Sequence, residues 1–346
     1  MRKTFLFLSV GFGAILLACE SVSAAPAYTV IDLGTLPGGT FSSARAINAN
    51  GEIAGVADVA PNTFVAFQYA NGQITNLGTL GGSTAIGLGI NTAGKVAGYS
   101  TDPDTYRAFL YNGKKMKDIG DLGGGTATAY AINRHGDVVG SSLTAGGDDD
   151  PFLYSSKTKT MTDLGNLGPV SPGEWNVASA INDSGQVTGE SWDNNSGGFF
   201  AFLWDNGRMK NLGTLGGSYS TGSAINQYGQ VTGQAYLPGG AEAHAFLWSK
   251  GHMKDLGVLP GGPGYSWGLG INSVGRVVGY SELNSGVTYV DHAFIYSGNA
   301  MRDLNDLIPR HSGWLLGVAY AVNDSGAIVG EGTVHGAIHG FLLTPK

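Results

Sequence analysis

Three observations in the amino-acid sequence predict an all-β fold, a seven-bladed β-propeller with four strands per blade. First, the phrase A-I-N-x-x-G-x-V-x-G recurs with small changes, and its asparagines are Asn48, Asn91, Asn133, Asn182, Asn226, Asn272 and Asn323. Second, these asparagines are 42 to 51 residues apart, which is the length of one propeller blade. Third, the two ends of the chain carry complementary parts of one repeat.

The composition agrees with many short strands joined by tight turns. The chain of 346 residues contains 58 glycines, and only 13% of its residues are charged. The glycines are periodic and separated by aromatic and aliphatic residues, which argues against disorder. Patterns of 3.6-residue periodicity with helix caps are missing, so helices are not expected.

Residues 1–24 have the features of a signal peptide, with Arg2 and Lys3 before an apolar run over 5–18. Two processing sites compete. The sequence Val22-Ser23-Ala24 suits ordinary signal peptidase, whereas Leu16-Leu17-Ala18-Cys19 resembles a lipobox that would leave a lipid anchor on Cys19. The expected location is therefore secreted, periplasmic or at the cell surface, with an outer-membrane lipoprotein as one form. Cys19 is the only cysteine, so no disulfide framework is expected.

The repeat over 175–214 shows how one blade is built. Its strands are expected at 175–182, 186–191, 200–204 and 208–212. Asn182-Asp183-Ser184-Gly185 makes the turn between the first two strands, and Asp205-Asn206-Gly207 the turn between the last two. Asn and Gly suit such turns because they tolerate positive φ.

Two further phrases mark the third and fourth strands of every repeat. The third strand carries an Ala-Phe pair or a variant of it, with the phenylalanines at Phe67, Phe109, Phe152, Phe202, Phe246, Phe294 and Phe341. The fourth carries the phrase D/N-L-G or a variant of it, and the first residues of this phrase are Asp32, Asn76, Asp118, Asp163, Asn211, Asp255 and Asp303. Each phrase occurs seven times, which fixes the number of blades.

The phase of the repeats predicts how the ring closes. After the leader, the chain opens with a lone fourth strand over 28–34 and ends with strands one to three of a last repeat, closing at 341–343. An open solenoid would need capping repeats instead. We therefore expect one domain over 25–346, closed by pairing of the N-terminal strand with the C-terminal blade. A β-solenoid and a pair of β-sandwiches are the alternatives.

The phrases together resemble the HAF-repeat proteins. The resemblance rests on His244-Ala245-Phe246 and His292-Ala293-Phe294, combined with D-L-G-x-L-G-G and the asparagine phrase, and it covers 28–343. Four copies lack the histidine, where Val65, Arg107, Asp150 and Phe200 replace it. The resemblance implies a bacterial extracellular protein, and it brings no agreed activity and no catalytic residues.

The connections between strands divide into two kinds. Those joining strands one to two and three to four are short and uniform, and lie on one face of the ring. Those joining strands two to three, such as 190–200 and 280–292, are long and varied and lie on the other face. Because binding residues often lie on variable loops of a rigid scaffold, the second face is the candidate binding face. Unselected surface loops are the alternative.

Tryptophans are the strongest binding signal. Trp175, Trp267 and Trp314 precede inner strands, and Trp192 lies beside a variable loop. Aromatic rings near Asp and Asn suit the recognition of glycans or peptides, so these four are predicted to bind a ligand. The alternative is burial at the strand entrances. Trp204 and Trp248, in third strands, are expected to pack between blades.

One loop has the beginning of a calcium-binding pattern. Asp193-x-Asn195-x-Gly197 alternates oxygen donors, although the closing Glu of an EF-hand is missing. A solvated loop is the alternative, and no other cofactor is expected. His244, His292 and His339 are expected to be structural, because equivalent third-strand positions lie too far apart for zinc. Gly264-Tyr265-Ser266-Trp267-Gly268 matches a nucleophile motif, but it runs into a strand and not a helix.

Charge and hydropathy exclude two classes of partner. The formal net charge is −7 without a basic stripe, so nucleic acid is not expected, and no second apolar run could span a membrane. The sequence therefore predicts a secreted or surface-tethered, non-catalytic binding module for a glycan or an extracellular protein. The alternatives are a hydrolase or lyase with its site over the central channel, and a purely structural protein.

Overall fold

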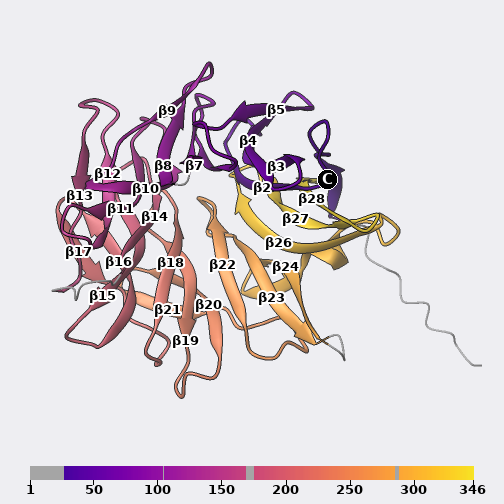
Figure 1. The fold of residues 1–346 in the computed structure, drawn as a ribbon. Helices are drawn as coiled ribbons and strands as arrows, with labels where there is room; N and C mark the ends of the chain where they lie inside the picture. The colour runs from indigo at the N-terminus through magenta and orange to yellow at the C-terminus, as the bar shows by residue number, and fades with distance from the viewer. Residues whose placement is uncertain (1–26, 104, 169–174, 285–287) are drawn as a thin grey trace, which may run out of the picture.

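The computed structural model describes residues 27–346 except 104, 169–174 and 285–287. Its described residues form seven four-stranded antiparallel sheets arranged as the blades of a ring (Figure 1). The predicted seven-bladed β-propeller is therefore confirmed. The predicted signal peptide over 1–24 and the candidate lipid anchor Cys19 lie outside the described residues.

The blades are numbered in chain order and their strands run from the channel outward. Blade 1 contains β2 (Ser42–Ile47), β3 (Ile53–Ala60), β4 (Thr63–Ala70) and β5 (Gln73–Gly78). Blade 2 contains β6 (Ala85–Ile90), β7 (Val96–Asp102), β8 (Thr105–Tyr111) and β9 (Met116–Asp118). Blade 3 contains β10 (Gly123–Ile132), β11 (Val138–Thr144), β12 (Asp149–Tyr154) and β13 (Met161–Asp163). Blade 4 contains β14 (Val177–Ile181), β15 (Val187–Asp193), β16 (Gly198–Asp205) and β17 (Arg208–Asn211).

The remaining blades follow the same order. Blade 5 contains β18 (Ser220–Ile225), β19 (Val231–Tyr236), β20 (Ala243–Ser249) and β21 (His252–Asp255). Blade 6 contains β22 (Ser266–Ile271), β23 (Val277–Asn284), β24 (Tyr289–Ser297) and β25 (Ala300–Asp303), followed by the short 3₁₀ helix η1 (Leu304–Leu307). Blade 7 combines β26 (Trp314–Val322), β27 (Ile328–Val334) and β28 (Ala337–Pro345) with β1 (Tyr28–Asp32).

Blade 7 joins the two ends of the chain, as the phase of the repeats predicts. β1 pairs antiparallel with β28 from Tyr28 opposite Pro345 to Asp32 opposite Phe341. The Leu33 amide extends the ladder by donating to the Gly340 carbonyl at 3.0 Å. The outer edge of β28 is thus covered by the chain's own N-terminal strand, which removes a template for aggregation.

A phenylalanine and a glycine explain two of the repeated phrases. All seven third-strand phenylalanines are fully buried, and each pairs with the glycine of the V-x-G phrase on the second strand. A Cβ at any of these glycines would collide with a carbonyl oxygen of the first strand. The glycine therefore lets the inner strand approach closely, and the phenylalanine ring fills the space between blades.

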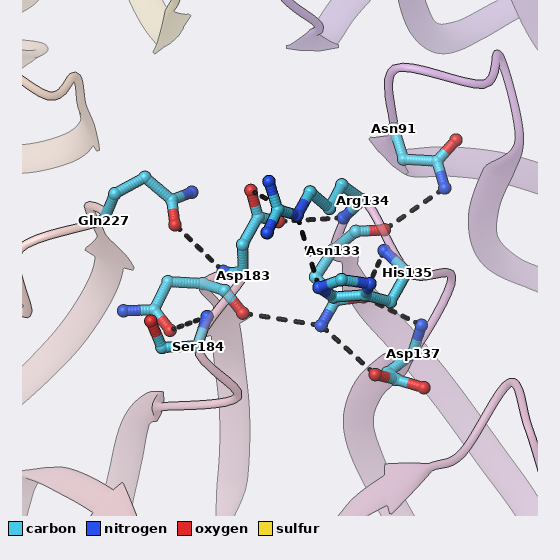
Figure 2. A network of polar contacts seen from close by, with 9 residues as sticks. Asn91, Asn133, Arg134, His135, Asp137, Asp183, Ser184 and Gln227 are labelled. Atoms are coloured by element: carbon cyan, nitrogen blue, oxygen red, sulfur yellow. Dashed lines mark hydrogen bonds and ion pairs between the residues drawn. The ribbon is translucent and has the colours of Figure 1, made fainter.

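The seven repeated asparagines do more than the turn-making expected of them. Each Asn Nδ2 donates to the backbone carbonyl of the asparagine in the next blade, at 2.8 to 3.4 Å, and Asn323 completes the circle by donating to Asn48. Part of this circle is visible in Figure 2, where the Asn91 side chain reaches Asn133. Asn133 donates in turn to the Asn182 carbonyl. We call it the asparagine ring. It links all seven blades independently of the β1–β28 pairing.

The side-chain oxygen and the backbone carbonyl of each asparagine in the ring also accept hydrogen bonds. Every Oδ1 accepts the backbone N–H four residues on, which holds the turn. Each asparagine carbonyl accepts a second bond from the glycine three residues on, whose φ of +70° to +88° favours glycine. The asparagines are at most 8% exposed, so these bonds satisfy polar groups that water does not reach.

Candidate functional site

The inner strands surround a central channel with two different mouths. The asparagine mouth lies at the turns between first and second strands, and the asparagine ring lines its hollow of about 280 Å³. The loop mouth lies at the opposite end, with the connections between second and third strands. These were predicted to be long, but they span only two to six residues, because the paired strands extend into the predicted loops, as β15 and β16 do over much of 190–200. The structure thus places the variable loops and one channel opening on the same face.

The loop mouth contains a hollow of about 350 Å³ with residues from all seven blades. It is lined by Arg45, Leu88, Tyr130, Val177, Ser179, Glu190, Thr221, Ser223, Trp267, Leu269 and Tyr320. This volume falls at the lower end of the range of about 300–1,000 Å³ that is usual for small-molecule pockets. Aromatic rings, hydroxyls and two opposite charges converge here, so the loop mouth is the candidate binding site.

Most of these residues come from one position of the repeat, three residues before the asparagine. This position holds Arg45, Leu88, Tyr130, Ser179, Ser223, Leu269 and Tyr320 in blades 1 to 7. Sequence reasoning missed it because it sought binding residues on the variable loops and among the tryptophans, and not at one position of the inner strands. The available signal was the contrast between this position, where the blades differ in size and charge, and its uniform neighbours.

On the side of blades 4 and 5, a tyrosine holds the carboxylate of Glu190. The Tyr219 hydroxyl donates to Glu190 Oε2 at 2.6 Å. Burial, followed by the negative charge of Glu190, raises the pKa of Tyr219 well above its usual value. The phenol therefore stays protonated and keeps donating at any physiological pH.

Blades 7 and 1 meet in a charged cluster formed by Arg45, Tyr320 and Glu331. The Arg45 guanidinium lies 4.1 Å from the centre of the Tyr320 ring, and its Nη2 is 3.5 Å from Glu331 Oε2. The Tyr320 hydroxyl donates to Glu331 Oε1 at 3.0 Å. Burial is the main cause of a raised pKa of Tyr320. Each member of the cluster is thus oriented by the other two.

The four predicted tryptophans occupy different environments. Trp267 of blade 6 lines the loop mouth, and its Nε1 donates to Ser223 Oγ of blade 5 at 2.8 Å. Trp192 packs edge-on against Phe199 and donates to Asn194 Oδ1 at 2.7 Å. Trp175 is 62% exposed outside the hollow, whereas Trp314 packs against the core of blade 7 beside Phe341.

The expectation that three of these tryptophans precede inner strands needs correction, because only Trp175 does so, whereas Trp267 lies within β22 and Trp314 begins β26. Trp267 stands five residues before its asparagine, Trp175 stands seven before, and Trp314 nine before. Of these three tryptophans, only Trp267 lines the hollow at the loop mouth. Ligand binding by Trp175, Trp192 and Trp314 stays a prediction, and Trp267 is the one that lies among the candidate site residues.

The candidate calcium loop is built around a well-satisfied carboxylate. Asp193 is buried and accepts from the Asn195 amide at 3.0 Å, from Ser196 Oγ at 3.0 Å and from Asn211 Nδ2 at 3.1 Å. Burial alone would raise the pKa of Asp193, but these hydrogen bonds outweigh it and lower the pKa. Asn195 contributes its backbone to this turn and is exposed. Calcium binding by the pair stays a prediction.

Histidines and the nucleophile-like motif have structural partners. His244, His292 and His339 each contact the Asp that ends the neighbouring fourth strand, through Nδ1 at 2.6 to 3.0 Å. Ser266 is fully buried; its Oγ donates to the Gly257 carbonyl and accepts from the Ala245 amide. In the described part of the chain, no group of three His, Cys, Asp or Glu side chains could hold a metal ion.

Comparisons with known proteins agree on the fold. A puromycin-hydrolysing peptidase from Mycobacterium tuberculosis is 13% identical, with a TM-score of 0.56 over 86% of this chain and 52% of that chain. The β-propeller domain of the trilobed protease from Pyrococcus furiosus is 9% identical, with a TM-score of 0.53 over 88% of this chain and 95% of that chain. Likeness at such identity carries the fold and no activity.

Other comparisons are negative. No protein-family model and no curated protein matches the sequence. The chain spans about half of the peptidase, 52% of its length. The Pyrococcus domain is described as having an open velcro topology, whereas β1 and β28 pair here. Among the described residues, no helix has the length and apolar character needed to cross a membrane.

Proposed function

We propose that this protein is a secreted or surface-tethered, non-catalytic module that binds a glycan at the loop mouth. The observation that carries the proposal is the convergence of Tyr130, Trp267 and Tyr320 with Glu190 and Arg45 around one hollow. Flat aromatic faces stack on sugar rings, and carboxylates, guanidinium groups and hydroxyls bond to sugar hydroxyls. The extracellular location follows from the predicted leader over 1–24 and the HAF-repeat resemblance.

Size favours a glycan over an extracellular protein as the ligand. A stable protein interface buries about 800 Å² on each partner, and the wall of a hollow of about 350 Å³ supplies only a fraction of that area. Such a hollow accepts a narrow ligand or a chain end. A protein that protrudes into the channel is the outcome to be distinguished by experiment.

The pairing of the charged groups favours binding over catalysis. Glu190 and Glu331 each accept a hydrogen bond from a tyrosine, and three histidines are engaged by aspartates at outer strands. These arrangements orient side chains without setting a general base against a nucleophile. The hydrolase or lyase alternative would be supported by cleavage of a bound glycan during the same experiment.

Two tryptophan variants test the proposal. Trp267→Ala should weaken the binding of array-identified glycans by about thirtyfold, since an aromatic anchor is lost, and should leave the melting temperature nearly unchanged. Trp248, which is 6% exposed in the blade 5 core, is the control, and Trp248→Ala should cost about 3–5 kcal/mol of stability. The absence of any glycan binding, or equal destabilisation by both variants, would overturn the proposal.

A further inference from the structure

The turns around the asparagine mouth carry an excess of positive charge. We call the side of the ring formed by the turns between first and second strands and between third and fourth strands the asparagine face. Among the described residues, these turns contain eight lysines and arginines but four acidic residues. Six of the basic side chains are exposed and form no salt bridge: Lys114, Lys115, Lys157, Lys159, Lys250 and Arg276.

The four acidic side chains of the asparagine face already have partners. Glu52, Asp137, Asp183 and Asp324 each accept a hydrogen bond from a donor on the same face. The basic side chains are spread over four blades and over 95–276 in the sequence. Only the closed ring therefore brings them to one side, which is why the sequence shows no basic stripe.

The opposite side of the ring has the opposite charge. In the part of the chain that the structure describes, the connections between second and third strands and between blades contain Arg310 as their only lysine or arginine. The strand ends beside these connections carry Asp102, Asp149 and Asp193. The negative net charge of the chain is therefore compatible with a basic face on one side.

Two large apolar side chains are exposed among the charges of the asparagine face. Tyr228 is 76% exposed and Val274 is 70% exposed, the two highest values among the large hydrophobic residues that the structure describes. Each stands two residues after a ring asparagine, in the turns of blades 5 and 6, where the other blades have Asn, Ala, His or Ser. Exposed aromatic and aliphatic side chains beside basic residues are typical of surfaces that enter the head-group region of a membrane.

The described chain also begins at the asparagine face. β28 ends there with Pro345, which pairs with Tyr28, and the Lys346 amide donates to the Ala27 carbonyl at 3.0 Å. Cys19, the predicted lipid anchor, is eight residues before Ala27 in the sequence, and eight residues span at most about 29 Å. An anchor at Cys19 would therefore hold the asparagine face, and not the loop mouth, toward the membrane.

We propose that the asparagine face docks on a membrane surface with anionic head groups. The exposed lysines and Arg276 contact the head groups, while Tyr228 and Val274 enter the boundary between head groups and acyl chains. The two apolar side chains favour a bilayer over a soluble anionic polymer, which offers them no apolar phase. In this orientation the loop mouth opens away from the membrane. The proposal does not depend on the binding of glycans.

Co-sedimentation with lipid vesicles tests the docking with the chain from Ala25 onward, which keeps every described residue. It should bind vesicles of phosphatidylcholine and phosphatidylglycerol, but not phosphatidylcholine alone, and binding should fall as salt rises. Lys114→Glu/Lys115→Glu should weaken binding at least tenfold, because each lysine near an anionic surface contributes about fivefold in affinity.

A matched pair of variants separates position from total charge. Lys157→Glu on the asparagine face and Arg310→Glu on the opposite side change the net charge equally, and both side chains are exposed. Lys157→Glu should weaken vesicle binding about fivefold or more, whereas Arg310→Glu should change it less than about twofold, with the melting temperature unchanged in both. Equal losses in the two variants would overturn the docking face.

A fluorescent label tests which face meets the bilayer. The chain from Ala25 onward contains no cysteine, so Tyr228→Cys provides a single site for a polarity-sensitive dye. Its emission should shift to the blue on anionic vesicles. The control is a dye at Tyr289→Cys, since Tyr289 is 62% exposed at the start of β24 on the opposite side, and its emission should not shift.

Three other results would overturn the proposal. They are the absence of binding to anionic vesicles, a blue shift at position 289 but not at 228, and binding to dextran sulfate without binding to vesicles. The last result would identify a soluble polyanion as the partner. None of the three bears on glycan binding at the loop mouth, so the proposed function is tested separately.

Discussion

The two mouths of the channel are built from the same seven repeats, but the asparagines that surround one mouth are identical in every blade and the residues that line the other vary. At the asparagine mouth every blade supplies the same residue, which makes the same bond to its neighbour. At the loop mouth the equivalent inner-strand position holds Arg, Leu, Tyr or Ser. A backbone requirement explains identity in all blades, whereas differences between blades allow a site with distinct sides.

This difference indicates that the two mouths have different roles. The asparagine ring satisfies its own donors and acceptors, so its seven carbonyls carry two hydrogen bonds each within the protein. At the loop mouth, Tyr130, Trp267 and Tyr320 instead line a hollow. The asparagine ring therefore stabilises the contacts between blades at one mouth, and recognition is proposed at the other.

Breaking the asparagine ring should have the largest effect. Asn182 donates to Asn226 and Gln186 and accepts from Ser184 and Gln186 while 1% exposed. Asn182→Ala should lower the free energy of unfolding by about 3 kcal/mol, because several buried groups lose their partner. Urea denaturation measures this. The exposed control Ser184→Ala should stay within about 0.5 kcal/mol. A loss below about 1 kcal/mol for Asn182→Ala would show that the ring is dispensable.

A smaller effect is expected at the candidate calcium loop on the other face. Asp193→Ala removes the acceptor for Asn195, Ser196 and Asn211, so it should cost about 1–2 kcal/mol even with a chelator present. If the predicted calcium site exists, millimolar calcium should also raise the melting temperature of the unmodified chain but not of the variant. Equal melting temperatures of both proteins in chelator would contradict the turn role.

The smallest effect concerns an acidic residue near the loop mouth. Burial, and then the charge of Glu331, raises the pKa of Asp291. The folded protein therefore binds this proton more tightly than the unfolded chain, and the resulting stability, present below about pH 3.9, is lost as pH rises through the folded pKa. Asp291→Asn should stabilise the protein at pH 7 by on the order of 0.5 kcal/mol and have little effect at pH 3.

Thermal unfolding at both pH values measures the effect of Asp291→Asn. Asp324, whose Oδ1 accepts from the Ser273 amide at the asparagine mouth, supplies the matched substitution. Asp324→Asn should destabilise slightly at pH 7, because a charged acceptor is lost. If Asp291→Asn lowered the melting temperature at pH 7, the ionised Asp291 carboxylate would stabilise the fold. That result would contradict the raised pKa of Asp291.

The sequence by itself determined the fold, because repetition exposes what each blade needs. Glycine opposite phenylalanine, such as Gly189 opposite Phe202, is a local packing requirement that recurs seven times. The lone strand over 28–34 likewise predicted its pairing with β28, since an unpaired edge must be covered. Turn-making by Asn182 was equally readable, because the bond to the Gln186 amide joins residues four apart.

Only the tertiary structure determined which side chains from different blades contact each other. Asn323 bonds to Asn48 across a separation of 275 residues, and Arg45 reaches Glu331 only because blades 7 and 1 are neighbours in the closed ring. The same holds for the tryptophans, since one bulged inner strand turns Trp267 toward the channel while another carries Trp314 into the core. Local patterns specify strands and turns, but side chains from distant blades converge only through the curvature of the whole ring.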